Sequence, residues 1–198
     1  DAVLKGSFHK YAAENKAKRG TAEVDADFLE EIERWRKKLA ENIALRNLKL
    51  SQRELNFAVQ RIIDRIIFLR IAEDRGLETY GRLQALTSGP RIYPRLCQLF
   101  EAADARYNSR LFHFQRERAR HEAPDELTLG LAIDDKLLKD ILKNLYYPDS
   151  PYAFSVLSAD ILGQVYEQFL GKVITLQDNR RVVVEDPADA RVAPFVGL

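Results

Sequence analysis

Apolar residues recur at helical intervals along most of the chain. Asp27, followed three residues later by Glu30, has the pattern of a helix start. Apolar side chains then follow at steps of three and four: Phe28, Ile32, Trp35, Leu39 and Ile43. Charged residues fall on the other side of this helix, so we predict an amphipathic helix that starts at Asp27 and ends before a hinge at 47–50.

A second helix is predicted over 51–76. Ser51 and Glu54 form a capping-box pattern, and Gly76 is a natural stop, which together give about seven turns. Apolar residues cover about half of its circumference, and further apolar side chains lie on the far side: Phe57, Phe68 and Ile71. A helix that is apolar almost all round is typical of the centre of a bundle.

Arg70 lies inside the apolar arc of this helix, where an unpaired charge would be very costly. We therefore expect Arg70 to be paired, either with Glu73 on the next turn or with a carboxylate from another helix. A contact between Arg70 and a ligand or phosphate is the less favoured alternative.

The elements after Gly76 are shorter. We predict helices over 79–87 and 92–106, an irregular segment over 107–134, a helix from Asp134 or Asp135 to about Tyr146, and a helix that ends at Gly171. The period then changes to two, so residues 173–176 and 181–185 indicate a β-hairpin that should lie on the helices or on something absent here.

The fold class expected from these patterns is mainly α, a multi-helix bundle around the central helix 51–76 with a small C-terminal β-hairpin. We divide the chain into a helical region over 1–172, the hairpin over 173–185, and a linker over 186–198. The single Cys97 fits a reducing, cytoplasmic location. The absence of any Met predicts a piece of a longer protein.

Composition and motifs argue against catalysis by this segment. The 198 residues carry 31 Lys and Arg against 30 Asp and Glu, and 46% are hydrophobic, as in ordinary globular chains. Glycine-rich phosphate loops and nucleophile elbows are absent from the sequence, and His9, His113 and His121 are scattered. The E-x-K tripeptide at 14–16 has no supporting strand. We expect no catalytic residue, metal or cofactor here, and an enzyme with a helical cleft is a rival without support from spacing.

Charge is nevertheless uneven along the chain. Five arginines interleave with aromatic residues and only one carboxylate within 106–120: Arg106, Arg110, Arg116, Arg118 and Arg120. Guanidinium groups match phosphate geometry, and Tyr107, Phe112 and Phe114 could stack on bases or sugars, so we predict a nucleic-acid contact.

Two further readings of the charge pattern stay open. The next stretch, 122–140, is acidic, so the basic and acidic segments could instead pair with each other. A second basic patch could be formed by Arg34, Arg36, Lys37 and Lys38, or by Arg61 and Arg65.

Several short runs together resemble a known protein family. They are Trp35-Arg36 with Asn47, and the segments 54–61, 66–76, 107–112, 147–152 and 161–171. In this order and spacing the runs resemble the middle region of type IIG restriction enzymes, which fuse a DNA endonuclease to an adenine-N6 methyltransferase. The resemblance covers about residues 28–175.

The resemblance implies that residues 1–172 form a helical connector domain between an N-terminal nuclease and a methyltransferase. It also implies that the linker over 186–198 leads toward a missing C-terminal methyltransferase-like domain. Such a connector holds both domains in register and could touch the backbone of double-stranded DNA. S-adenosylmethionine and Mg²⁺ are implied for the parent protein, not for this segment. The alternative is a protein-interaction scaffold that makes no contact with DNA.

Overall fold

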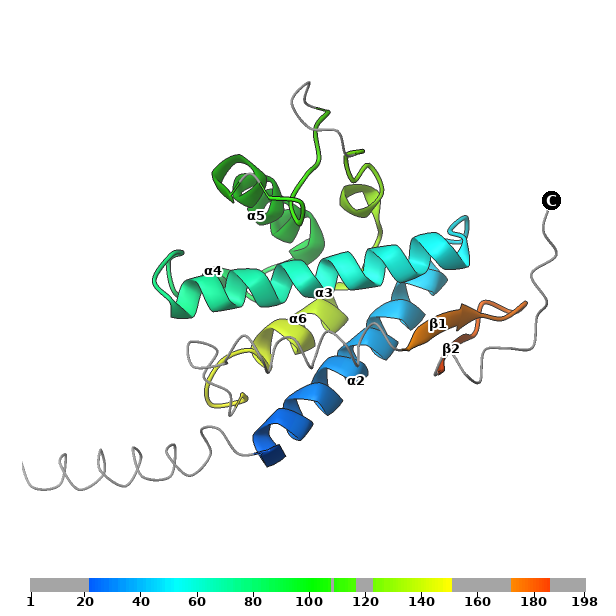
Figure 1. Cartoon of the computed structure of the whole chain (residues 1–198), viewed down its shortest axis with the longest axis horizontal. Helices are drawn as coiled ribbons and strands as arrows, with labels where there is room; N and C mark the ends of the chain where they lie inside the picture. Colours follow the sequence, from blue (N-terminus) through cyan, green and yellow to red (C-terminus); the bar gives the residue numbers. More distant parts are fainter. Residues whose placement is uncertain (1–21, 108, 117–122, 151–171, 186–198) are drawn as a thin grey trace, which may run out of the picture.

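A computed structural model describes residues 22–107, 109–116, 123–150 and 172–185 (Figure 1). The α-helices in these ranges are α2 (Ala22–Arg46), α3 (Gln52–Asp74), α4 (Arg82–Ala85), α5 (Ile92–Tyr107) and α6 (Asp135–Lys143). A short 3-10 turn, η1, covers Thr128–Gly130, and two strands follow, β1 (Val173–Leu176) and β2 (Val182–Glu185). The predicted mainly α fold with a C-terminal hairpin is confirmed.

Helix α2 begins at Ala22, before the predicted start at Asp27. Asp27 therefore lies inside the helix, and the prediction that it caps the helix is wrong. The predicted apolar face is confirmed, because its five side chains are at most 1% exposed: Phe28, Ile32, Trp35, Leu39 and Ile43. The helix ends before the short connection at 47–50, where the sequence places the hinge.

Helix α3 is the central element. Its capping box is present, because the Glu54 amide donates to Ser51 Oγ and the Ser51 amide donates to Glu54 Oε2. In Figure 1, α3 runs between α5 on one side and α2 and α6 on the other. Its buried residues join one hydrophobic core with side chains from α2, α5, α6 and the hairpin. Phe57 departs from the predicted all-round burial, since it is 37% exposed.

The connection after α3 contains more turn and less helix than predicted. Gly76 and Gly81 both adopt positive φ, +72° and +84°, which L side chains rarely adopt, and helix α4 covers only Arg82–Ala85. Helix α6 ends at Lys143 rather than near Tyr146, although Tyr146 is buried in the core. The predicted helix before Gly171 and the predicted linker 186–198 lie outside the described residues.

The hairpin is antiparallel, with Ile174 opposite Val184, and it packs on α2 and α3 as expected. The side chain of Asn56 in α3 pairs with the outer edge of β1, donating to the Ile174 carbonyl at 2.7 Å and accepting from the Ile174 amide at 2.9 Å. Gln52 Oε1 accepts from the Leu176 amide at 3.0 Å. These side chains satisfy backbone groups that an isolated two-stranded ribbon would leave unpaired.

Arg180, in the turn of the hairpin, fastens this turn to the connection between α2 and α3. Its guanidinium donates to four backbone carbonyls, at 2.7–3.3 Å, which belong to Ala44, Asn47, Leu48 and Leu50. Because these carbonyls lie at and beyond the end of α2, one side chain satisfies acceptors that the helix leaves free. The hairpin and the hinge are therefore one packed unit.

None of the helices in the described part of the chain combines the length and the apolar character needed to cross a membrane.

Candidate functional site

The structure describes three of the five arginines predicted to contact nucleic acid. Arg106 lies in the last turn of α5, and Arg110 and Arg116 lie on the segment that follows it. All three are exposed. Arg118 and Arg120 lie outside the described residues.

The aromatic residues between these arginines point into the protein rather than outward. Phe112 is fully buried, and its ring meets Phe68 of α3 edge to face at 5.4 Å between centroids. The Tyr107 hydroxyl donates to Glu78 at 2.7 Å. Phe112 is thus unavailable for stacking on a base, and that part of the hypothesis is wrong. The aromatic side chains instead anchor the segment on α3, because their apolar area is better buried than solvated.

The acidic stretch after these arginines pairs with α2 and α3. Asp125 binds Arg65 at 2.7 Å, Asp134 binds Arg46 at 2.9 Å, and Asp140 binds Lys38 at 3.3 Å. These three carboxylates therefore pair with α2 and α3 and not with the arginines of 106–120. Residue Asp135 has another role, since it accepts the backbone N–H groups of residues 91 and 92 at the start of α5.

Neither form of the predicted second basic patch is intact, because each contains a buried arginine. Arg36 is 5% exposed and donates to the backbone carbonyl of Lys172, just before the hairpin, and burial lowers its pKa. Arg65 is 1% exposed. Both guanidinium groups hold the fold together, so neither is a surface phosphate ligand.

Arg65 is the structural centre that sequence reasoning missed. Its guanidinium donates to the Leu111 carbonyl at 2.9 Å, to Thr128 Oγ1 at 2.7 Å and to Asp125 Oδ2 at 2.7 Å. The available signal was its place on the helical wheel, between Ala58 and Ala72 and therefore inside apolar surroundings. A buried arginine at such a position needs a carboxylate partner.

Asp125 is held ionised by this network. Burial alone would raise the pKa of its carboxyl, but hydrogen bonds from Thr128 and the charge and hydrogen bond of Arg65 outweigh burial and lower it. The irregular segment after α5 is therefore fixed to α3 at a charged but fully satisfied point.

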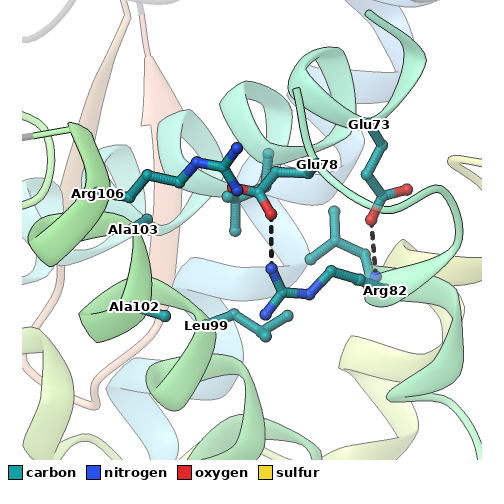
Figure 2. A pocket seen from close by; sticks show the side chains of 9 residues that line it. Glu73, Glu78, Arg82, Leu99, Ala102, Ala103 and Arg106 are labelled. Atoms are coloured by element: carbon teal, nitrogen blue, oxygen red, sulfur yellow. Dashed lines mark hydrogen bonds and ion pairs between the residues drawn. The ribbon is translucent and has the colours of Figure 1, made fainter. Parts of the chain in front are cut away.

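A pocket of about 240 Å³ lies where the end of α3, α4 and α5 meet (Figure 2). Glu78 forms its polar side and accepts hydrogen bonds from Arg82 at 2.6 Å, Arg106 at 3.1 Å and Tyr107 at 2.7 Å. Figure 2 shows both guanidinium groups turned toward Glu78. The rest of the lining is largely apolar: Leu69, Leu83, Leu99, Ala102 and Ala103.

The second carboxylate of this pocket, Glu73, is equally occupied. It accepts the backbone N–H groups of Gly81 and Leu83, each at 2.9 Å, and the hydroxyl of Tyr146 at 2.6 Å. Burial raises the pKa of Glu78, but its three donors outweigh that effect and lower it. With its pKa lowered in this way, Glu78 is a poor general acid or base near neutral pH. The hydrogen bonds of Glu73 and Glu78 thus join the end of α3 to α4 and α5.

The described residues bring together no group of three or more His, Cys, Asp or Glu that could hold a metal ion. Cys97 is buried, and burial raises the pKa of its thiol to about 11, so the thiol stays protonated at neutral pH. His113 is also buried.

Comparisons with known proteins give one relative, which is similar to this chain over part of its own length. No protein-family model and no solved structure matches the chain. The chain is 34% identical over 185 residues to the type II restriction enzyme and methyltransferase RM.Eco57I of Escherichia coli. The resemblance expected from the sequence is confirmed. The match covers 93% of this chain but only 17% of the relative, so the chain matches one region of that much longer relative.

Proposed function

We propose that this chain is a non-catalytic helical spacer and coupling module of a DNA restriction-modification enzyme. It holds a nuclease domain and an adenine-N6 methyltransferase domain of the same polypeptide in register. The observation that carries the proposal is the match to one region, 17% in length, of a restriction enzyme and methyltransferase. The parent protein is an enzyme of the cytoplasm and of the type IIG class, and its S-adenosylmethionine and Mg²⁺ bind to the flanking domains.

The packing supports such a role because the module is tied together around the C-terminal end of α2. Near the end of α2, Asn42 and Arg46 bind Asp134, and Asn47 pairs with the backbone of Ala132 in both directions. Arg180 then binds the connection that follows. A body with these ties and one core transmits orientation far better than a flexible linker.

Contacts with DNA form the second part of the proposal. Arg110 and Arg116, together with Arg118 and Arg120 farther along, contact the backbone of double-stranded DNA, and Arg106 lies at the edge of the same surface. The exposure of the three described arginines supports this assignment. Phosphate contacts would orient the module on the duplex without reading bases.

The spacer role is tested in the full-length protein by loosening the hairpin. The double variant Arg180→Ala, Asn56→Ala removes the side chains that bind the hinge and the edge of β1. We expect the cleavage positions to spread over several base pairs while methylation is retained, because only the geometry between domains has changed. A matched double variant, Arg181→Ala with Arg53→Ala, alters exposed residues and should leave the positions unchanged. Sharp, unshifted cleavage by the first variant would refute the spacer role.

The alternative, a protein-interaction scaffold without DNA contact, is separated by binding measurements. Replacing Arg116, Arg118 and Arg120 by Ala in the full-length protein should weaken binding about equally for any duplex sequence, and should reduce its salt dependence. Unchanged affinity would reject this placement of the DNA-facing surface.

A further inference from the structure

A second basic feature lies away from the arginine segment. A hollow of about 510 Å³ lies between α2 and α6. Asn42, Asp134, Leu137 and Asp140 line part of it. Four lysines complete the lining, Lys38 from α2 and three from α6: Lys136, Lys139 and Lys143. In Figure 1, α6 lies on the opposite side of α3 from the segment that follows α5.

The three lysines of α6 form a stripe on one face of the helix. Lys136, Lys139 and Lys143 are spaced by three and four residues and are exposed. The opposite face is the buried one, formed by Leu138, Ile141 and Leu142. Burial of these apolar side chains fixes the rotation of α6, so the lysine stripe necessarily faces outward over the hollow.

The carboxylates of the hollow are already engaged. Asp134 binds Arg46 and Asn42, and Asp140 binds Lys38 at 3.3 Å. Asp135, at the start of α6, accepts two backbone N–H groups. Within the described ranges, no carboxylate forms an ion pair with the three lysines of the α6 stripe. Among the described residues, the hollow therefore carries four lysines against two aspartates, and these aspartates pair with Arg46 and Lys38 rather than with the three lysines of α6.

We propose that this hollow binds backbone phosphates of double-stranded DNA, an inference that rests on the proposed function. From Lys136 to Lys143 the helix rises by about 10 Å, which is the scale of several phosphates along one strand. Lysine is a flexible, hydrated point charge, suited to contacts that fix position without reading sequence. An acidic protein partner is disfavoured, because specific protein interfaces need an apolar centre and Leu137 is the one large apolar side chain among the described lining residues.

The test uses the full-length protein with Lys136, Lys139 and Lys143 replaced by Ala. Each phosphate contact contributes about −0.9 to the slope of log affinity against log salt, so the slope should become shallower by up to about 2.7. Between 50 and 200 mM salt, the wild type should lose up to about 40-fold more affinity than the variant, for unrelated duplexes alike. The corresponding triple Lys→Arg variant keeps the charges and should keep the wild-type slope.

The matched control removes three exposed cations elsewhere: Lys49, Arg53 and Arg75. It changes the net charge equally, so an equal loss of affinity in both variants would overturn the inference, as would a wild-type slope in the lysine variant. Thermal unfolding checks that each variant is folded, and a triple Lys→Gln variant replaces the Ala variant if α6 is weakened. Cleavage positions, measured with the hairpin variant above, report on the spacer role independently. The lysine inference can therefore fail while the proposed function stands, and the reverse.

Discussion

The guanidinium of Arg65 lies in the core with all three nitrogens bonded. One carbonyl, one hydroxyl and one carboxylate accept from it, and the Phe114 ring lies 4.5 Å from its central carbon. A buried charge of this kind is tolerated only while every partner remains, because desolvation outweighs attraction once one partner is lost. The attachment of the segment after α5 to α3 therefore depends most strongly on the two side chains of the Arg65–Asp125 pair.

Replacing Asp125 by Asn tests this dependence. The variant keeps the size of the side chain but leaves the charge of Arg65 without a counter-ion, so we expect a loss of about 3–5 kcal/mol in the free energy of unfolding. Urea denaturation measures it. As a control, Asp140→Asn removes a half-exposed pair with Lys38 and should cost at most about 1 kcal/mol. Equal, small losses in both variants would contradict the role given to the buried pair.

The same carboxyl predicts a pH dependence. The folded state lowers the pKa of Asp125, so ionisation favours folding. This stabilisation is present above the unfolded pKa of about 3.9 and is lost as the pH falls through the lower folded value. The gap in unfolding free energy between wild type and Asp125→Asn should therefore narrow below about pH 4. Denaturant titrations from pH 7 to strongly acidic pH measure the gap, and a constant gap would contradict this assignment.

At the scale of single residues, the sequence predicted that a buried arginine needs a carboxylate partner, but it did not predict which carboxylate. Arg70 is paired as expected, and Glu73 lies 3.9 Å away, but its closer partner is Asp74 on the same helix. The Leu145 carbonyl accepts from it as well. Helical spacing makes several carboxylates reachable, and tertiary packing chooses among them. Arg65 was missed because its partner, Asp125, lies 60 residues away.

At the scale of elements, the hairpin is stable because the helices complete it. Asn56 and Gln52 of α3 pair with β1, and Arg180 binds the connection after α2. The strand boundaries followed from the change to a period of two, and the expectation that the ribbon lies on the helices is confirmed. The bonds of Arg180 could not be predicted, since they join a turn residue with no local signal to backbone carbonyls 130 or more residues away.

Removing Arg180 should release the hairpin more than any neighbouring change. Arg180→Ala deletes four hydrogen bonds to carbonyls, of which, among the described residues, only the Asn47 carbonyl keeps a backbone donor, the Leu50 amide, so we expect local opening to become easier by about 2–4 kcal/mol. Hydrogen exchange of the amides at 173–176 and 182–185 measures this opening, with α3 amides as an internal reference. Arg181→Ala, at an exposed position, is the control. Exchange at the wild-type rate in Arg180→Ala would show that the hairpin is held by its apolar contacts alone.

Helix boundaries show where sequence information ends. The start of α3 was predicted to the residue because a capping box is a local interaction between two side chains. Asp27 and Glu30 have the same spacing as Ser51 and Glu54, but Asp27 lies inside α2, because this helix begins at Ala22. A polar residue followed three positions later by an acidic residue marks a helix start only where the polar residue itself has a non-helical backbone. The sequence alone does not reveal that backbone conformation.

At the scale of the whole molecule, one core connects all packed elements. The cluster runs from Phe28 in α2 to Val182 in the hairpin without a break, and the ties of Arg65 and Arg180 add to it. The charged residues are arranged in the same way. Three residues of the acidic stretch 122–140 bind α2 or α3, and the lysines of α6 and the described Arg110 and Arg116 are exposed. Both features suit a body that must keep its shape while it joins other domains.

Unfolding of the 198-residue chain should accordingly be a single transition. Trp35 is the only tryptophan and is 1% exposed in the core, so its fluorescence reports tertiary packing, whereas far-ultraviolet circular dichroism reports helix content. In one cooperative unit the two signals change at the same urea concentration and with the same slope. Loss of the tryptophan signal well before the helix signal would mean that α2 detaches from α3 on its own. A module that separates in this way could not transmit orientation between domains, and the spacer role would lose its physical basis.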